Sequence, residues 1–274
     1  MKSKKILKIA GILLAAGLLL QTGILAYTSV FTGGNDSNAD ISKVTVAAEV
    51  QNLIKAQEPS EFDKNLNNYK RMIVLLNIHN TFKAEIEKLI SEGKKATDIM
   101  IAYTYLNDCY GKMAQVAELV NKKAAGRTWQ EIFSQYESEN PAFKPRSFDF
   151  DYLDSLSKKE GVTADDIMIA DRISQNADMP FEEVIQEKVS GKSWKDINAA
   201  LSIINGQDAM PRVPVTPEQL KKYASGESFN EDRVVQTLVT AFKLGLDEKA
   251  AIDKAKAGYT TAEFFAEALE KKYN

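Results

Sequence analysis

Cysteine and histidine are almost missing from this 274-residue sequence, which contains one of each. The single cysteine, Cys109, allows no intrachain disulfide, and its expected role is that of a small buried apolar side chain. The single histidine, His79, has no second His or Cys partner with which to form a zinc site or a catalytic nucleophile. We expect His79 to cap a helix or to lie at the surface.

Sequence motifs of common cofactor and catalytic sites are absent as well. No Gly-rich phosphate loop, dinucleotide fingerprint, Gly-x-Ser-x-Gly elbow or His-Glu-x-x-His motif occurs. We therefore expect no cofactor, no metal site and no catalytic residue, and we interpret the protein as non-enzymatic.

Positive charge is concentrated at the N-terminus, and the remainder of the chain is acidic. Four lysines precede the first apolar run, namely Lys2, Lys4, Lys5 and Lys8. Without these four, 31 of the 35 basic residues remain against 38 acidic residues, a net charge of −7. A surface of that sign repels nucleic acid and anionic lipid, so we expect no nucleic-acid partner.

A long uncharged segment follows these lysines. The 23 residues from Ile9 to Phe31 are enough, as a helix, to cross a hydrocarbon core of about 30 Å. The lysines favour a cytoplasmic N-terminus, so residues 1–31 are predicted to be a transmembrane signal anchor that leaves the rest of the chain outside the cell membrane. The alternative is a cleaved signal peptide and a secreted protein, although Ile24-Leu25-Ala26 is a poor cleavage site.

A polar stretch with paired glycines comes next, at residues 32–42 (TGGNDSNADIS), and is predicted to be a flexible tether. Residues 43–81 are then expected to form N-terminal helices, near 43–56 and 61–79.

A glycine turn recurs six times in the remaining sequence. The six copies are Gly93-KKATDI, Gly126-RTWQEI, Gly161-VTADDI, Gly191-KSWKDI, Gly226-ESFNED and Gly258-YTTAEF. Glycine can take the left-handed conformation that ends one helix, and Ser/Thr-x-x-Asp/Glu caps the next helix. The predicted capping pairs are Thr128 with Glu131, Thr163 with Asp166, Ser193 with Asp196, Ser228 with Glu231, and Thr260 with Glu263. Only the first copy departs from this rule, because Lys95 occupies its cap position.

A longer period of 65 to 68 residues overlies these turns. Apolar residues beside the glycines follow helical spacing, and no proline falls inside a predicted helix. We predict an all-α fold, an array of short helical hairpins in three four-helix modules. These are module 1 (82–140), module 2 (146–210) and module 3 (217–274), stacked as an α-solenoid or closed as a compact bundle. The side-chain signature of tetratricopeptide repeats is missing, so no family is recognised.

Acidic side chains form two groups that could bind calcium or serve a hydrolase. Asp149, Asp151 and Asp154 lack the glycine and the terminal glutamate of a calcium loop. Asp165 and Asp166 lie in a capping turn, which already explains Asp166. We therefore favour structural roles for both groups.

Aromatic residues occupy the same place in three of the turns, at Trp129, Trp194 and Phe229. We expect them to pin the helices of each hairpin together rather than to stack on a sugar or a peptide. The segment GKSWKDINAAL resembles the helix-turn-helix of DNA-binding domains. The predicted export, the acidic balance and the recurrence of the turn argue against DNA.

The leading hypothesis is a membrane-tethered, extracytoplasmic helical-repeat protein that binds or scaffolds another protein or a cell-envelope polymer. One alternative is a cell-envelope glycan hydrolase with paired carboxylates, for which Asp149, Asp151 and Glu160 are the first candidates. Such an enzyme needs two facing carboxylates in a groove, one of them with a raised pKa. A structural spacer is the third possibility.

Overall fold

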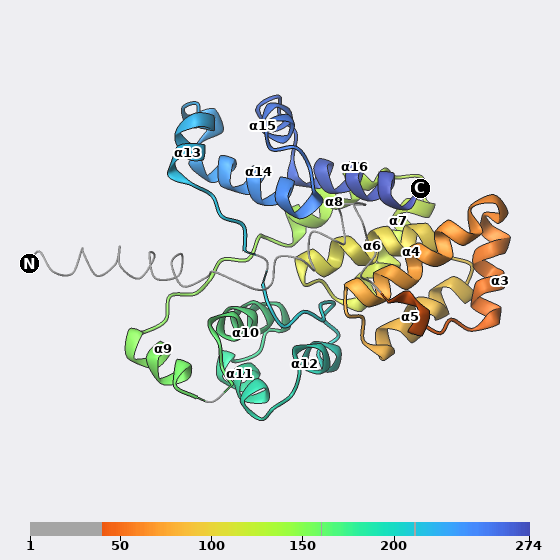
Figure 1. Cartoon of the computed structure of the whole chain (residues 1–274), viewed down its shortest axis with the longest axis horizontal. Helices are drawn as coiled ribbons and strands as arrows, with labels where there is room; N and C mark the ends of the chain where they lie inside the picture. The colour runs from red at the N-terminus through yellow and green to blue at the C-terminus, as the bar shows by residue number, and fades with distance from the viewer. Residues whose placement is uncertain (1–39, 160, 211) are drawn as a thin grey trace, which may run out of the picture.

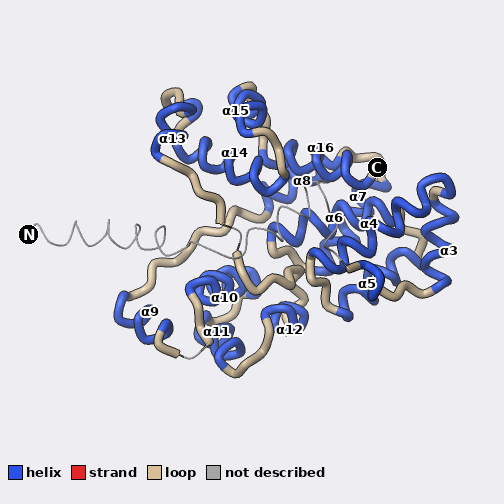
Figure 2. Tube along the Cα trace, in the orientation of Figure 1, coloured by secondary structure: helices blue, strands red, loops and turns tan. Residues whose placement is uncertain are grey.

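The structure, a computed structural model, describes residues 40–274 except 160 and 211. In that part of the chain it is all-helical, as predicted, with fourteen α-helices and no strand (Figure 2). The N-terminal helices are α3 (Ala48–Gln57) and α4 (Phe62–Leu75). The helices that follow are α5 (Asn80–Ser91), α6 (Ala96–Cys109), α7 (Met113–Ala124), α8 (Trp129–Glu139), α9 (Phe150–Ser157), α10 (Ala164–Ala177), α11 (Phe181–Val189), α12 (Trp194–Ala200), α13 (Pro217–Tyr223), α14 (Glu231–Leu244), α15 (Glu248–Lys256) and α16 (Thr261–Tyr273).

The predicted signal anchor, residues 1–31, lies outside the described residues, as does most of the predicted tether. From residue 40 onward, none of the helices combines the length and the hydropathy needed to cross a bilayer. The end of the predicted tether belongs to the folded part, because the Asp40 carboxylate accepts the Ser42 backbone N–H and caps a 3-10 helix at Ile41–Lys43.

Four of the six glycines end a helix as predicted. Gly93, Gly126, Gly191 and Gly258 all have positive φ and lie two residues past the ends of α5, α7, α11 and α15. At the last of these turns, the Tyr259 N–H donates to the Lys254 carbonyl at 3.0 Å and the Gly258 N–H donates to the Ala255 carbonyl at 3.1 Å. This Schellman pattern satisfies carbonyls that the end of a helix otherwise leaves unpaired.

Four of the five predicted side-chain caps are also present. The hydroxyls of Thr128, Thr163, Ser193 and Thr260 accept the backbone N–H three residues later, at 3.1 to 3.3 Å. In the three threonine copies the acid at that later position accepts the threonine N–H in return. Each reciprocal pair satisfies two donors at a helix start, and replacing such a cap with alanine typically costs about 1 kcal/mol.

The predicted pair of Ser228 with Glu231 is wrong. Helix α14 begins at Glu231, and its cap is Asn230, whose side-chain oxygen accepts the Arg233 N–H at 3.0 Å. The residues from Gly226 to Phe229 contain a 3-10 turn, and Gly226 has an extended ψ of −160° that does not end a helix. The glycine and the cap are therefore two residues further apart here than in the other copies.

Lys95 provides no side-chain cap for α6, as its sequence position indicated. The Gln57 side chain at the end of α3 replaces it, since its oxygen accepts the Ala96 N–H at 2.9 Å while its nitrogen donates to the Lys94 carbonyl. The first glycine turn is thus capped from a neighbouring helix.

A second set of left-handed turns, not predicted, reinforces the long period. Helices α6, α10 and α14 each have 14 residues and end at Tyr110, Asp178 and Gly245, all with left-handed backbone. These positions are 68 and 67 residues apart. The same order of elements therefore recurs three times. It consists of a long helix, a left-handed turn, a shorter helix, a glycine or capped turn and a final helix.

The helices enclose two hydrophobic cores. The larger core takes residues from α3–α8 and α13–α16, and the smaller one takes residues from α9–α12 together with Tyr110. Figure 1 shows α13–α15 and α9–α12 on opposite sides of the molecule, with α3–α7 beside them at the right of the view. Module 3 therefore packs on module 1 rather than on module 2, its neighbour in sequence.

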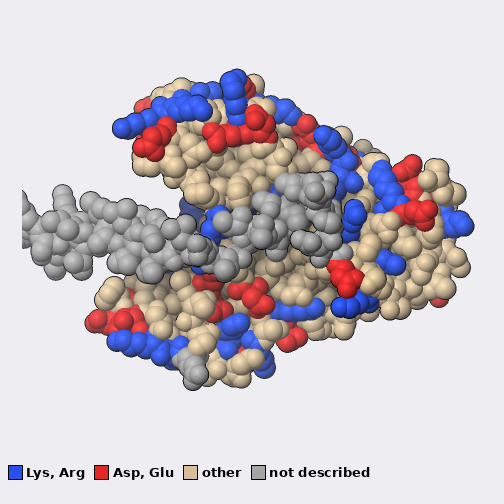
Figure 3. All heavy atoms as spheres, in the orientation of Figure 1, with Lys and Arg blue, Asp and Glu red and all other residues tan. Residues whose placement is uncertain are grey.

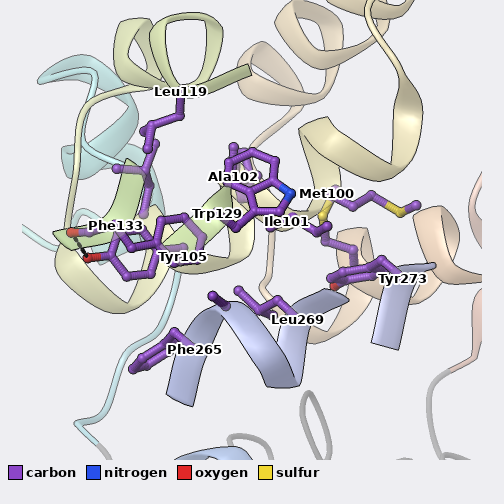
Figure 4. Close-up of a cluster of buried hydrophobic side chains, with 14 of the residues drawn as sticks. Met100, Ile101, Ala102, Tyr105, Leu119, Trp129, Phe133, Phe265, Leu269 and Tyr273 are labelled. Atoms are coloured by element: carbon purple, nitrogen blue, oxygen red, sulfur yellow. Dashed lines mark hydrogen bonds between the residues drawn. The ribbon is translucent and has the colours of Figure 1, made fainter. Parts of the chain in front are cut away.

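Helix α16 makes the central contact of the larger core, against α6 and α8 (Figure 4). The rings of Tyr105 on α6 and Phe133 on α8 are stacked, with centroids 3.7 Å apart, and Phe265 of α16 lies edge-on to Tyr105 at 5.6 Å. Leu269 and Tyr273 of α16 are also buried in this cluster. Burial of side chains this large contributes about 1.5–3 kcal/mol each before the loss of conformational entropy.

Backbone hydrogen bonds and a close backbone contact join module 2 to the preceding helices. The Ile204 N–H donates to the Gly111 carbonyl at 2.7 Å, and the Met113 N–H donates to the Ser202 carbonyl at 2.9 Å. Gly206 approaches the preceding helices so closely that a Cβ at this position would lie 2.2 Å from the Asn77 carbonyl oxygen. The segment after α12 thus requires glycine where it crosses the α4–α5 turn.

Candidate functional site

The acids proposed from the sequence serve the helices instead of forming a site. Asp149 caps α9 by accepting the backbone N–H groups of Asp151 and Tyr152 at 3.0 and 3.2 Å. Asp151 is exposed on that helix, and Asp154 pairs with Lys158 one turn later. Glu160 lies outside the described residues. None of the first three lines either of the two surface hollows described below.

The second acidic group is held in the framework of module 2. Asp166 caps α10 and accepts the Trp194 indole N–H at 2.6 Å, and the Lys188 ammonium lies 3.5 Å from the same carboxylate. Asp165 pairs with Arg212 at 2.7 Å. Both carboxylates therefore have structural partners, as expected from the sequence.

The aromatic residues of the turns are buried, which confirms that they pin the hairpins. Trp129 and Trp194 are 0% exposed and Phe229 is 3% exposed. A lysine lies over each tryptophan ring, Lys123 at 5.6 Å and Lys188 at 5.5 Å, in equivalent positions of modules 1 and 2. None of the three rings is available for a sugar or a peptide.

The equivalent tryptophans differ in their polar partner. Trp194 donates to Asp166, whereas the buried Trp129 N–H has no hydrogen-bond partner. Lys188 lies near the acid of its own module, whereas Lys123 lies 3.4 Å from Glu270 on α16 of module 3. The lysine of module 1 thus contributes to the contact with α16.

The single histidine and the single cysteine have structural surroundings. The His79 Nδ1 accepts the Thr81 backbone N–H at 3.1 Å at the start of α5, which confirms the capping role. Cys109 is partly buried against the larger core, and burial raises the pKa of its thiol to about 12. A thiol with so high a pKa is a poor nucleophile at neutral pH.

Two surface hollows adjoin each other along α14, on the side where module 3 meets module 1. The first has a volume of about 400 Å³ and the second about 260 Å³. Gln236, Thr240 and Thr261 line both. The side chains that line only the first are Asp108, Asp232, Val235, Val239, Lys243 and Phe265, and those that line only the second are Glu137, Arg233, Thr237, Tyr259, Thr260 and Phe264. We call these two hollows together the α14 groove.

The two parts of the α14 groove differ in character. Three apolar side chains, Val235, Val239 and Phe265, contribute to the first part, and Val235 is 37% exposed. Hydroxyl and amide groups dominate the second part, where Glu137 is half-buried. An apolar surface beside a polar hollow can fix both the position and the orientation of a bound group.

Glu137 is the most perturbed carboxyl of the groove. Its pKa is raised to about 7, chiefly by burial; a hydrogen bond from Tyr105 lowers the pKa, and the negative charge of Asp108 raises it. The Tyr105 hydroxyl lies 3.5 Å from the Glu137 carboxylate and 3.4 Å from the Phe133 carbonyl, the bond drawn in Figure 4, and the stack of Tyr105 on Phe133 fixes the ring. Glu137 therefore changes its charge close to neutral pH.

The positive groups of the groove already have partners. Lys243 lies 2.7 Å from Asp108, and both side chains are less than one-fifth exposed. The Arg233 guanidinium donates to the carbonyls of Ser228 at 2.9 Å and Ala255 at 3.3 Å. No ion pair between described residues neutralises Glu137.

Sequence reasoning missed Glu137 because its surroundings come from distant segments. Its helix is amphipathic, and nothing in the local sequence separates it from Glu139, two residues later. Its burial requires α6 on one side and α14 with the Tyr259–Thr261 turn on the other. Of the residues that line this hollow, Thr260 is the one whose structural role, the cap of α16, was predicted from the sequence.

No group of three or more His, Cys, Asp or Glu side chains among residues 40–274, as far as these are described, could hold a metal ion. Acidic and basic side chains are interspersed over the face in Figure 3. No model of a known protein family, no curated protein and no solved structure matches the chain.

Proposed function

We propose that the protein is a membrane-tethered, extracytoplasmic helical-repeat protein that binds or scaffolds a partner and has no catalytic activity. In this proposal residues 1–31 form a single transmembrane anchor, with the C-terminal helices outside the cell membrane. Three four-helix modules follow as an array in which module 3 folds back onto module 1. The lysines before an uncharged run of 23 residues support the anchor and its orientation. Cleavage after this run would give a secreted protein of the same kind.

The observation that carries the binding role is the α14 groove. It lies where two copies of the same module meet, and its apolar part leaves Val235 more exposed than most large apolar side chains of the protein. Helical-repeat proteins bind through surfaces that several repeats build together. The partner is expected to be a protein or a polymer of the cell envelope.

Site-specific photocrosslinking in intact cells tests this function. A photoreactive residue at Val235 would report on the groove, and the same residue at Leu246 is a matched control, because the two side chains are 37% and 36% exposed. Leu246 lies in the turn between α14 and α15 and lines neither hollow. We expect a discrete crosslinked partner from position 235 and none from position 246. No partner at position 235, together with turnover of an envelope substrate by the purified protein, would contradict the proposal.

The raised pKa of Glu137 beside Asp108 also favours a second candidate, a glycan hydrolase of the cell envelope. Such an enzyme needs a protonated carboxylic acid near neutral pH and a second carboxylate across the bound sugar. Glu137 and Asp108 replace Asp149 and Asp151 as the residues that would act. Release of reducing sugar ends from purified cell wall by the wild type, lost in Glu137→Gln, would support this candidate over a binding protein.

Mass measurement of the mature N-terminus, after fractionation of the native cells, tests the localisation. A membrane-bound chain that retains residues 1–31 supports the anchor, whereas a soluble chain that begins after this segment supports secretion.

A further inference from the structure

In the polar hollow beside Glu137, no cation of the described residues forms an ion pair with the Glu137 carboxylate. Arg233 lines this hollow, but its guanidinium is directed to the Ser228 and Ala255 carbonyls. Lys243 is held by Asp108 in the adjoining hollow. Among the described residues, the Glu137 carboxylate accepts a hydrogen bond from Tyr105 alone, and this bond is 3.5 Å long and therefore weak.

A second polar side chain is shared by the two hollows. Thr240 is 5% exposed and lines both, and its hydroxyl makes no hydrogen bond with any described residue. The neighbouring hydroxyls differ, since Thr237 donates to the Arg233 carbonyl, Thr261 accepts from Gln236, and Thr260 caps α16. A group bound at this junction could therefore form a hydrogen bond with the Thr240 hydroxyl, which can donate or accept.

Three polar groups of this hollow can accept a hydrogen bond from a bound group. They are the Glu137 carboxylate, the Gln236 amide oxygen and the Thr240 hydroxyl, which can also accept. Ammonium and guanidinium groups carry only donors, and they form the strongest bonds with a carboxylate. The volume of about 260 Å³ is below the range usual for whole small-molecule ligands and suits a single side chain.

We propose that the hollow beside Glu137 binds one lysine or arginine side chain of the partner protein, whose apolar neighbours cover Val235 and Val239. This inference rests on the proposed binding function and names the chemistry of the partner. The negative charge of the ionised Glu137 carboxylate, which no cation among the described residues pairs with, favours a basic protein segment over a neutral glycan.

The titration of Glu137 adds a dependence on pH. Its surroundings contain Tyr105, Asp108 and Cys109 on α6, Arg233 on α14 and Tyr259 before α16. Of these, Asp108 is the neighbouring charge that raises the pKa, and no cation among the described residues lowers it. A bound cation would favour the carboxylate, so binding should be strongest above about pH 7 and should weaken as the pH falls below that value.

Titration of the full-length protein in lipid nanodiscs with two short peptides tests the inference. The first peptide is acetyl-Ala-Ala-Arg-Ala-Ala-amide, and the second carries citrulline, which is neutral and nearly isosteric, in place of arginine. The NMR signal of the Thr240 methyl group reports binding in the groove itself. At pH 8 we expect the arginine peptide to bind at least about tenfold more tightly than the citrulline peptide, as for a charge-assisted hydrogen bond.

Two matched variants separate Glu137 from charge in general. Glu137→Gln should abolish the preference for arginine, whereas Glu139→Gln, an equal change of charge at an exposed position of the same helix, should retain it. The loss of preference in the wild type at pH 5 is a second measurement that needs no variant.

Equal binding of both peptides, binding of neither peptide, or equal losses in the two variants would overturn the inference. A response of Thr240 to a neutral oligosaccharide of N-acetylglucosamine, with none to the arginine peptide, would also overturn it and would assign the groove to a glycan. If a partner is still crosslinked at Val235 in any of these cases, the proposed binding function stands. Only the inference that the partner inserts a lysine or arginine side chain is then contradicted.

Discussion

The two tryptophans offer a matched test of the repeated architecture, because their chemical surroundings differ in one hydrogen bond. Trp129 and Trp194 are both fully buried at the same position of successive modules. Only the Trp194 N–H has a partner, the buried Asp166 carboxylate at 2.6 Å. Trp→Phe removes the same volume at both sites, and it removes a hydrogen bond to a charged group at Trp194 alone. Such bonds contribute about 1.5–3 kcal/mol.

We therefore expect Trp194→Phe to destabilise its module by about 2 kcal/mol more than Trp129→Phe destabilises module 1, on the order of 30-fold in the unfolding equilibrium. Urea unfolding followed by far-ultraviolet circular dichroism measures each loss. The tryptophan that remains in each variant reports whether the other module unfolds in the same transition. Equal losses, or a larger loss in Trp129→Phe, would refute the assignment of these hydrogen bonds.

Three further predictions concern the turns and the groove. Gly258→Ala should cost about 1–2 kcal/mol in urea unfolding, because φ is +103° and the new Cβ meets no atom within 4 Å, so only backbone strain acts; an unchanged midpoint would contradict this. Gly206→Ala should cost more, about 3 kcal/mol, because its Cβ would lie 2.2 Å from the Asn77 carbonyl oxygen, and a loss below that of Gly258→Ala would argue against this contact. Glu137 binds its proton more tightly in the folded state than in the unfolded state, so its contribution to stability falls as the pH rises from about 4.5 to about 7. Glu137→Gln should therefore gain stability relative to the wild type at pH 8 but not at pH 4, and a parallel pH profile of the two proteins would exclude this titration.

The local rules of helix ends were readable from the sequence, because they depend on residues a few positions apart. A glycine followed two residues later by Thr, with Glu three residues after the Thr, predicts a left-handed turn and then a capped helix start. Gly126, Thr128 and Glu131 form this structure. The rule failed at Ser228 because Asn230, two residues on, is an equally good cap and starts the helix later. It also missed the left-handed turn at Tyr110, because a tyrosine in that conformation gives no signal in the sequence.

The packing of the modules could not be predicted in the same way. An apolar stripe identifies the buried face of a helix but not the helix that covers it. Leu269 of α16 lies on such a stripe, and the sequence does not indicate that it packs in the core with α6 and α8 of module 1. Glu137 depends on the same long-range contact, which explains why the carboxyl with the most unusual surroundings was not among the residues proposed from the sequence.

The central claim is that module 3 covers module 1 and builds a groove around Glu137, and the titration of that one carboxyl tests it most directly. In the full-length protein with ¹³C-labelled glutamate, the Glu137 carboxyl signal, assigned with Glu137→Gln, should titrate with a pKa of about 7. A pKa near 4.5, the ordinary value for glutamate, would mean that Glu137 is solvated and that α14 and α16 do not enclose it. The groove and both proposals that depend on it would then be contradicted.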